Sequence, residues 1–266
     1  MTSTIRKSTK RARPRDEGLK SLRKAIRVLE AFSMREPRLP LTEIARRVGL
    51  PLSTAHRILA TLHGEGFVDR DADRDQYRLG IRLLELGSIV LSTMELHREA
   101  LPFIEALSRE SGETIHLGIL DGTQVVSIEK MDSLHGLASN VTIGKGAPAY
   151  CTGVGKALLA FQPDSVVEAV CRQGLTRHTP NTVTSPRRLR EELTHVRASG
   201  YALDNMEHEL GVRCIAAPIR NHTGAVIASL SISGPATRIR AEDVPRLAER
   251  VKEVAGKLST QLGHRS

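Results

Sequence analysis

Hydrophobic residues in the first quarter of the chain recur three or four positions apart, which is the spacing of amphipathic helices. The first such block predicts a helix over residues 21–34, which ends before Pro37 because the residue before a proline disfavours helical backbone. A second block predicts a helix over residues 41–48. Gly49 follows it directly and permits the left-handed backbone on which many helices end.

A third apolar block, close behind the second, predicts a helix over residues 53–63. Pro51 suits its first turn, and Ser53 or Thr54 is expected to cap amides that have no partner there. Two short helices joined by a tight turn are typical of helix-turn-helix DNA-binding units. The alternative is an amphipathic helical hairpin with one solvated face.

A β-hairpin is expected after the third helix. Residues 66–68 and 76–79 have the composition of short strands, and the polar run 69–75 separates them. A hairpin in this place forms the wing of a winged helix-turn-helix. We therefore interpret residues 19–80 as a winged helix-turn-helix DNA-binding domain.

The third helix is expected to bury its apolar stripe and present polar side chains on its other faces. Hydroxyl, imidazole and guanidinium groups suit the DNA major groove, where base edges offer hydrogen-bond donors and acceptors. The residues that we expect to contact DNA are Ser53, Thr54, His56, Arg57 and Thr61 of this helix, Arg46 and Arg47 of the preceding helix, and Arg74 of the hairpin turn.

The distribution of charge supports this interpretation. Residues 1–80 hold 18 Lys or Arg against 10 Asp or Glu, whereas the remainder holds 21 against 20. A basic module joined to a near-neutral one is expected of a protein that binds a polyanion. Residues 1–18 form a basic tail that we expect to be disordered and to contact phosphates or a minor groove; a merely solubilising terminus is the alternative.

Residues 81–98 are too apolar for a helix that stands alone in water. We expect a linker helix that buries its apolar stripe partly against a second subunit; packing on its own domain is the alternative. A further helix around residues 101–111 opens a C-terminal domain at 99–264. Strand patterns at 114–120 and 124–130, joined by a turn at Asp121-Gly122, begin its sheet.

Helices and strands alternate irregularly through the rest of the C-terminal domain. Strands are expected at 201–204, 213–220 and 225–233, and helices at 153–161, 163–172, 186–199 and 241–262. Ser185 is a plausible cap of the third of these helices and Gly200 its stop. The pattern predicts an antiparallel sheet with helices, so the fold class is α+β.

Two groups of residues in this domain suggest a site for a small anion. Gly153 and Gly155 open a helix, whose first amides suit an anion, although tight packing of the helix start explains the glycines equally well. The segment is not a phosphate-binding P-loop, because Tyr150 and Ala157 stand where that motif needs glycine and a hydroxyl. Further polar candidates for the same pocket are Asp204, Cys214, Ser231 and Ser233.

These residues would suit a small carboxylate or hydroxy-acid, held by hydrogen bonds between apolar walls. In the alternative interpretation, the serines bond to neighbouring backbone and Asp204 caps a turn.

Several classes of protein are disfavoured. No apolar run approaches the roughly 20 residues that span a bilayer, and the N-terminus lacks the apolar region of a secretory signal. Three widely spaced cysteines, Cys151, Cys171 and Cys214, do not describe a disulfide framework, so a reducing cytoplasm is expected. Aromatic residues make up 3% of the chain, which disfavours base-stacking RNA platforms.

No catalytic, metal or cofactor motif is present in the sequence. There is no GxSxG elbow and no HExxH helix, and His208 lacks a second histidine four residues on. We therefore expect no enzyme, no metal and no cofactor. The rival hypotheses are an enzyme with a DNA-binding head and a nonspecific nucleoid protein.

Across residues 20–262 the chain resembles the IclR family of bacterial transcription regulators. The resemblance rests on LTEIARRVGLPLSTAHRILATL with GFV and YRLG, and then on GETIHLGILDG, CTGVGKALLA, GYALDNMEHELGVRCIAAPI and SISGP in this order. It implies a DNA-binding homodimer, often a dimer of dimers, with a C-terminal domain like a GAF domain that binds a small organic acid. It also implies a palindromic operator in front of catabolic genes, and we expect repression rather than activation.

The resemblance assigns effector contacts to Gly153, Val154, Asp204, Val212, Cys214, Ser231 and Ser233. Val154 stands where the family often has a smaller residue, which alters the volume of the pocket. The segment CTGVGKALLA and the preceding GAPAY are similar to members that sense sugar acids such as 2-keto-3-deoxygluconate. Related sequences respond instead to aromatic or short keto acids.

Overall fold

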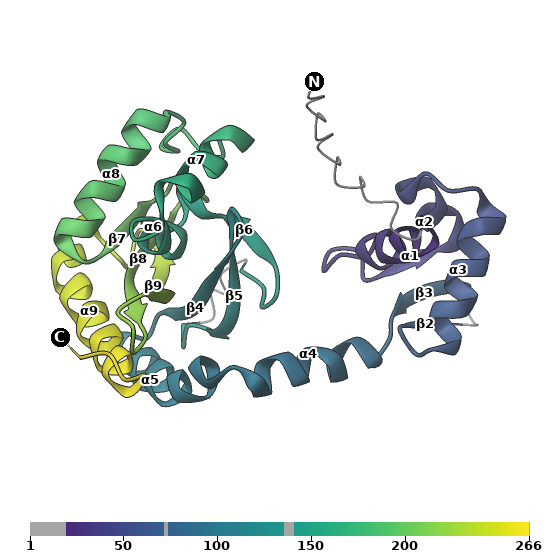
Figure 1. Cartoon of the computed structure of the whole chain (residues 1–266), viewed down its shortest axis with the longest axis horizontal. Helices are drawn as coiled ribbons and strands as arrows, with labels where there is room; N and C mark the ends of the chain where they lie inside the picture. The colour runs from purple at the N-terminus through teal and green to yellow at the C-terminus, as the bar shows by residue number, and fades with distance from the viewer. Residues whose placement is uncertain (1–19, 72–73, 136–140, 266) are drawn as a thin grey trace, which may run out of the picture. The chain divides into compact units, whose positions relative to one another are not determined.

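A computed structural model describes residues 20–71, 74–135 and 141–265, so the basic tail expected at 1–18 lies outside the described residues. The chain divides between Val90 and Leu91 into an N-terminal and a C-terminal unit. The N-terminal unit contains helices α1 (Lys20–Glu30), α2 (Leu41–Val48) and α3 (Leu52–Gly64) (Figure 1). Its antiparallel sheet has the order β1-β3-β2, formed by Arg38–Pro40, Gln76–Leu79 and Val68–Asp71.

The helix-turn-helix and its wing are confirmed. Gly49 ends α2 with a left-handed φ of 62°, as its position predicted. The buried side chains of this unit come from all of its elements, so the three helices and the sheet share one core: Val28, Leu39, Ile44, Val48, Leu59, Val68 and Tyr77.

Three details of the N-terminal unit differ from the expectation. Helix α1 ends at Glu30, because a turn between Ser33 and Glu36 leads the chain into β1. Strand β1 was not predicted; three residues ending in Pro40 carry too short a pattern. The expected side-chain cap of α3 is wrong, since the helix begins at Leu52 and the amide of Thr54 bonds to the carbonyl of Pro51.

The linker helix expected at 81–98 is present but ends earlier, at Thr93. Helix α4 (Arg82–Thr93) and helix α5 (Glu95–Ser111) are separate, because Met94 adopts extended backbone with φ −86° and ψ 96°. The expected boundary at residue 99 falls inside α5. From Leu96 onward, α5 buries apolar residues against the C-terminal core, and this packing sets where the second helix begins.

The C-terminal unit is built on an antiparallel sheet with the strand order β6-β5-β4-β9-β8-β7. The strands are β4 (Thr114–Asp121), β5 (Gln124–Met131), β6 (Gly146–Pro148), β7 (Ala202–Asn205), β8 (Val212–Arg220) and β9 (Val226–Pro235). The hairpin at Asp121-Gly122 is confirmed by the pairing of β4 with β5. The short edge strand β6 was not predicted, because glycine and proline dominate its three residues.

Helices cover both faces of this sheet (Figure 1). Helix α5 and helix α9 (Val244–Gln261), which follows a 3-10 turn at Ala241–Asp243, lie on one face. Helices α6 (Gly153–Leu159), α7 (Asp164–Gln173) and α8 (Pro186–Ser199) lie on the other, with a 3-10 turn at Ala149–Cys151 before α6. Ser185 caps α8 and Gly200 ends it, as predicted.

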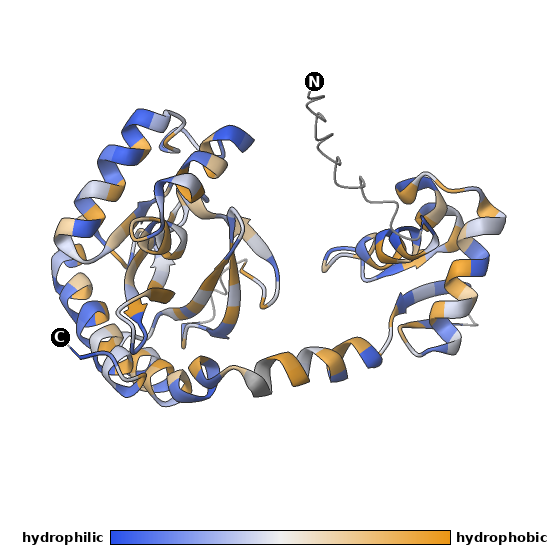
Figure 2. Ribbon diagram, in the orientation of Figure 1, coloured by the Kyte–Doolittle hydropathy of each residue, from blue (hydrophilic) through white to orange (hydrophobic). Residues whose placement is uncertain are grey.

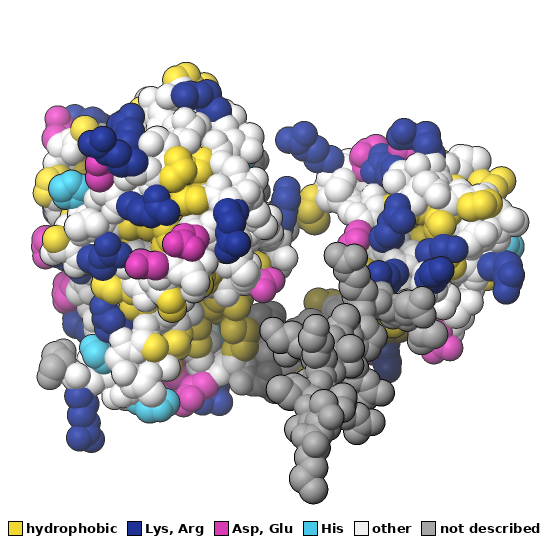
Figure 3. Space-filling model, turned by 45° about the horizontal axis from the view of Figure 1, so that its top comes forward, with side chains coloured by type: hydrophobic (Ala, Val, Ile, Leu, Met, Phe, Trp, Pro, Cys, Tyr) yellow, Lys and Arg dark blue, Asp and Glu magenta, His cyan; other side chains and the backbone are white. Residues whose placement is uncertain are grey.

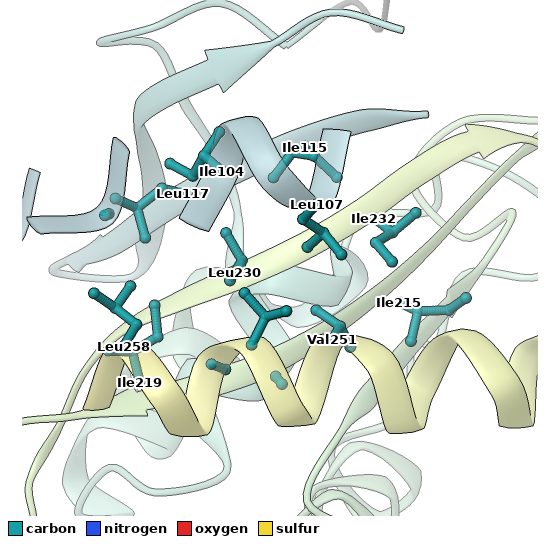
Figure 4. Close-up of a cluster of buried hydrophobic side chains, with 14 of the residues drawn as sticks. Ile104, Leu107, Ile115, Leu117, Ile215, Ile219, Leu230, Ile232, Val251 and Leu258 are labelled. Carbon is teal, nitrogen blue, oxygen red and sulfur yellow. The ribbon is translucent and has the colours of Figure 1, made fainter. Parts of the chain in front are cut away.

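The two faces of the sheet have separate cores. Figure 4 shows Ile104 and Leu107 of α5 and Val251 of α9 around apolar side chains of the strands, among them Ile115 and Leu117 of β4. Because side chains alternate along a strand, Thr114, His116 and Gly118 point to the opposite face, where α6 lies. The expected α+β class is confirmed, and this second face holds the candidate ligand site.

Within residues 20–71, 74–135 and 141–265, none of the helices combines the length and the apolar character needed to cross a bilayer.

Candidate DNA-binding surface and ligand pocket

Helix α3 presents the polar face that its sequence predicted. It buries Ala55 and Leu59, whereas Ser53, His56, Arg57 and Thr61 are exposed and Thr54 is half-buried. The Thr61 hydroxyl donates to the Arg57 carbonyl at 3.1 Å, so it is partly used within the helix. Arg57 lies with Thr54 and Thr61 along a groove between α1 and α3.

The two arginines expected to contact DNA from α2 are held by acidic neighbours. Arg46 and Arg47 both donate to Glu43, at 2.6 Å and 2.7 Å. These two hydrogen bonds lower the pKa of Glu43 to about 2. Arg47 also pairs with Glu36 at 2.7 Å and donates to the Ala31 carbonyl at 3.2 Å. The first role of Arg47 is therefore to tie α2 to the turn after α1, whereas Arg46 pairs within α2.

The wing has a similar pattern of ion pairs. Arg70 pairs with Asp75 at 2.7 Å, and Arg78 pairs with Asp69 at 3.2 Å. Arg74 is exposed in the turn, where its backbone amide donates to Asp71. Figure 3 shows Lys and Arg side chains over the visible face of this unit, on the right of the view.

Sequence reasoning missed a basic contribution from α1. Lys24 lines the same groove as Arg57, and Lys20 and Arg23 are exposed nearby on the same helix. Arg27, by contrast, donates to the Val48 carbonyl at 2.5 Å and holds α1 against α2. The signal was present in the sequence, since the polar face of the first helix carries mostly Lys and Arg.

In the C-terminal unit, one row of side chains crosses four strands of the sheet. Thr114 of β4 lies opposite Ser233 of β9, which lies opposite Cys214 of β8, which lies opposite Asp204 of β7. Residues directly opposite in antiparallel strands share a face and lie about 4.5–5.5 Å apart. Three residues far apart in the sequence, Asp204, Cys214 and Ser233, are thus brought together by strand register.

The start of α6 lies directly on this row. A Cβ atom on Gly153 would stand 2.9 Å from the Cys214 sulfur, and one on Gly155 would stand 2.3 Å from the Ala149 carbonyl oxygen. Both glycines are therefore required for close packing, which was the alternative interpretation of the pair. The Thr152 hydroxyl caps the helix by accepting the Gly155 amide at 3.2 Å.

A pocket of about 610 Å³, its open mouth included, opens between this helix start, the sheet and the loop after β7. Apolar walls come from Val125, Val141, Ala147, Val154 and Val212. Among the residues expected to bind the effector, those that line this pocket are Gly153, Val154, Asp204, Val212, Cys214 and Ser233. Ser231 does not line it, because it lies one pleat further along β9, fully buried between His116 and Ala216.

Asp204 has two roles in the structure. Its carboxylate accepts the amide of Glu207 at 2.7 Å, so it caps the turn after β7, and it also lines the pocket. Burial raises its pKa from 3.8 to about 7. A carboxyl group near its pKa at neutral pH can donate a hydrogen bond as well as accept one.

Lys156 is a buried residue whose importance the sequence did not indicate. Its ammonium group is fully buried and lies 2.5 Å from Glu192 of α8, from Glu207 and from the Leu203 carbonyl. Burial alone would lower the pKa of Lys156, but attraction by Glu207 and Glu192 outweighs it and raises the pKa. This ion cluster ties α6 to α8 and to the turn that Asp204 caps.

Two of the three cysteines, Cys151 and Cys214, are unsuited to nucleophilic chemistry. Burial raises the pKa of Cys151 and of Cys214 to about 12, so neither is a thiolate near neutral pH. No group of three or more His, Cys, Asp or Glu side chains in the described part of the chain is arranged to hold a metal ion.

His116 is the other residue that sequence reasoning missed. It lines the pocket from β4, and neither of its ring nitrogens has a hydrogen-bond partner among the described residues. The signal that would have found it is strand alternation, which places His116 on the same face as Ser231.

Known proteins resemble the chain over nearly its whole length. The regulator KdgR of Escherichia coli is 37% identical over 249 residues, 93% of this chain and 94% of its own. The regulator XynR of the same bacterium is 35% identical over 247 residues, 92% of this chain and 98% of its own. Both are HTH-type transcriptional regulators, and neither is an enzyme.

Solved structures agree with this assignment. An IclR homolog from Microbacterium hydrocarbonoxydans, complexed with 4-hydroxybenzoate, has a TM-score of 0.81 and 32% identity, covering 91% of this chain and 98% of its own. Residues 21–72 match the model of the IclR helix-turn-helix domain, and residues 88–260 match that of the bacterial transcriptional regulator IclR C-terminal domain. The chain therefore belongs to the IclR family of DNA-binding transcriptional regulators.

Proposed function

We propose that the protein represses a catabolic operon and that a small organic acid, bound in the pocket beside α6, controls its affinity for the operator. The observation that carries this proposal is the pocket itself. Six residues expected from sequence to bind the acid meet there, with apolar walls and a few polar groups, as is usual in small-molecule sites. That an IclR homolog is complexed with 4-hydroxybenzoate supports an organic acid as the ligand class.

On the DNA side, we propose that α3 enters the major groove. Arg57 is exposed and pairs with no acidic side chain among the described residues, in contrast to Arg46 and Arg47 of α2, so it is our first candidate for reading a base. His56, Ser53 and Thr54 would contact bases or phosphates beside it. Lys24 of α1 and Arg74 of the wing would hold phosphates, which supply affinity without sequence preference.

We also propose that the protein works as a homodimer through α4. Ile81, Leu84 and Leu86, at or beside the start of this helix, are 65%, 65% and 41% exposed. In Figure 2, most of the coloured part of α4 has the orange of hydrophobic residues. Exposed apolar side chains on a helix that joins two domains suit a partner helix, and two copies would match a palindromic operator. Because α5 packs on the effector domain and α4 precedes it across Met94, a ligand-induced change in α5 would alter the spacing of the DNA-binding domains.

The test uses the full chain and two measurements. Selection from random-sequence duplexes should enrich a palindrome whose half-sites lie about 10 base pairs, or a multiple of that, apart. A thermal-shift screen of keto, sugar and aromatic acids should find a stabilising ligand, by roughly 2.7 kcal/mol at about 100 times its Kd. That ligand should then change the affinity for the selected palindrome, because it binds the two conformations unequally.

Each part of the proposal has an outcome that contradicts it. Binding without any enriched sequence would identify a nonspecific nucleoid protein. If the protein selects a DNA sequence but no acid raises its melting temperature, the proposal that an organic acid is the effector is wrong. An acid that raises the affinity for the operator would act as a co-repressor, or the protein would be an activator; either result contradicts release of the operator by the acid.

A further inference from the structure

The buried imidazole of His116 has no structural partner. The side chain is 4% exposed, and neither Nδ1 nor Nε2 makes a hydrogen bond to any described residue. Its cross-strand neighbours are Ser231 of β9 and Lys130 of β5. Buried polar groups are nearly always hydrogen-bonded, so one that lacks a partner and lines a cavity calls for an explanation.

The protonation state of this ring fits the recognition of an uncharged group. Burial, with a smaller effect of Lys130, lowers the pKa of His116 to about 4. The ring is therefore neutral near pH 7, with one nitrogen that donates and one that accepts a hydrogen bond. A hydroxyl group or a carbonyl oxygen could satisfy it.

Three of the other polar residues of the pocket lie on one side of β4, away from β5. Asp204, Cys214 and Ser233 belong to β7, β8 and β9, next to the start of α6. His116 is on β4, and β9 lies between β4 and β8. Two strand spacings amount to about 10 Å, which an acid of about four to six carbons spans together with its hydrogen bonds.

Apolar side chains line the pocket on the other side of His116, toward β5. The Val154 side chain reaches from α6 to β4, where a Cβ on Gly118 would stand 2.8 Å from Val154 Cγ1. Val125 of β5 borders the same place, at 3.0 Å from that Cβ position. His116 therefore lies between polar residues on β7, β8 and β9 and a wall formed by Val154 and Val125, with Ser127 of β5 beside that wall.

We propose that His116 determines ligand specificity by hydrogen bonding to a second oxygen of the effector, remote from its carboxylate. The ligand class is then a monocarboxylic acid with a hydroxyl or carbonyl group at the far end of a short apolar body. This inference rests on the proposed function, namely that the pocket binds an organic acid.

The experiment measures binding of matched acids to the full chain by calorimetry. The probes are 4-hydroxybenzoate against benzoate, and 5-hydroxypentanoate and 4-oxopentanoate against pentanoate. The wild type should bind at least one oxygenated acid about tenfold or more tightly than its matched acid, because the unoxygenated acid leaves the imidazole unpaired. In His116→Phe that preference should fall to within about twofold.

A second variant and a control separate recognition from structure. His116→Asn keeps a donor and an acceptor and should retain part of the preference. His116→Phe without ligand should be no less stable than wild type, since the ring makes no hydrogen bond to lose. Ser229→Ala, on the same face of β9, removes a hydroxyl that donates to the Ala217 carbonyl at 3.0 Å and does not line the pocket, so it should lower stability and leave the preference unchanged.

The outcomes distinguish the two levels of the argument. If the wild type binds acids but binds each oxygenated acid no more tightly than its matched acid, the proposed role of His116 is wrong. The proposal that the effector is an organic acid would still stand. A preference that persists in His116→Phe would overturn the role of His116 as well. If no acid of any kind binds the wild type, the effector function itself fails, and the role of His116 with it.

Discussion

The two candidate sites of this protein are built in opposite ways. The DNA-binding surface is one exposed face of α3, whose residues are neighbours in the sequence and are held by a local helix. The ligand pocket lies within the C-terminal unit, and its residues come from all six strands of the sheet, the start of α6 and the loops before β6 and after β7. The first site therefore depends on which side chains are exposed, and the second depends on strand register and on the packing of one helix against a sheet.

The largest expected effect concerns the ion cluster that supports the pocket. Lys156→Met should lower the free energy of unfolding by about 3–5 kcal/mol, because Glu207 and Glu192 lose their buried partner. Denaturant unfolding measures this. The matched control is Lys257→Met, whose pair with Glu253 is on the surface and should contribute nothing measurable. Equal stability of the two variants would show that the pocket does not need the cluster.

The stability of the C-terminal unit should also depend on pH through Asp204. Its pKa is about 7 in the folded chain and 3.8 in the unfolded one, so the folded state binds more protons between these values. Stability from this group is therefore fully present below pH 4 and is lost as the pH rises to 7, by at most about 4 kcal/mol. Burial also raises the pKa of Glu207, which acts in the same direction.

Unfolding measured from pH 4 to pH 8 should show this decline in the wild type and a smaller one in Asp204→Asn. If the free energy of unfolding falls with pH equally in the variant and the wild type, Asp204 is ionised throughout this range and its carboxylate is solvated by water.

A smaller effect is expected from the glycine at the start of α6. Gly153→Ala places a methyl group 2.9 Å from the Cys214 sulfur and 3.1 Å from its carbonyl oxygen, which should cost about 1–3 kcal/mol. Gly256→Ala in α9, where nothing lies within 4 Å of the added Cβ, should instead stabilise by about 0.5–1 kcal/mol. Thermal unfolding should therefore show a lower melting temperature for Gly153→Ala and a higher one for Gly256→Ala. A neutral Gly153→Ala would argue for an open helix start with room for the anion that the sequence suggested.

The smallest effect on the fold, and a specific one on binding, is expected at the DNA surface. Arg57→Ala should leave stability unchanged and lose about 1–3 kcal/mol of discrimination between the operator and a variant site, if Arg57 reads a base. Arg46→Ala should lose less, since Arg46 is already paired with Glu43. Competition binding at fixed salt measures both. A uniform loss on all sequences in Arg57→Ala would make this residue a phosphate contact.

The elements that depend on near neighbours could be predicted from the amino-acid sequence. The apolar spacing and Gly49 define α2, Ser185 and Gly200 bound α8, and Asp121-Gly122 joins β4 to β5. In each case the hydrogen bonds and backbone angles that decide the structure lie within a few residues. The exposed polar face of α3 could be predicted for the same reason.

The features that depend on distant neighbours could not be predicted, because they follow from how the elements pack on one another. The break at Met94 follows from where α5 begins to pack on the core, and the pairing of Arg47 with Glu36 follows from how α2 meets the turn after α1. Lys156 is buried because carboxylates 36 and 51 residues away surround it. Ser233 lines the pocket whereas Ser231 does not, although both point to the same face. Alternation gives the face of a strand, but the helix laid across that face decides which residue stays open to a ligand.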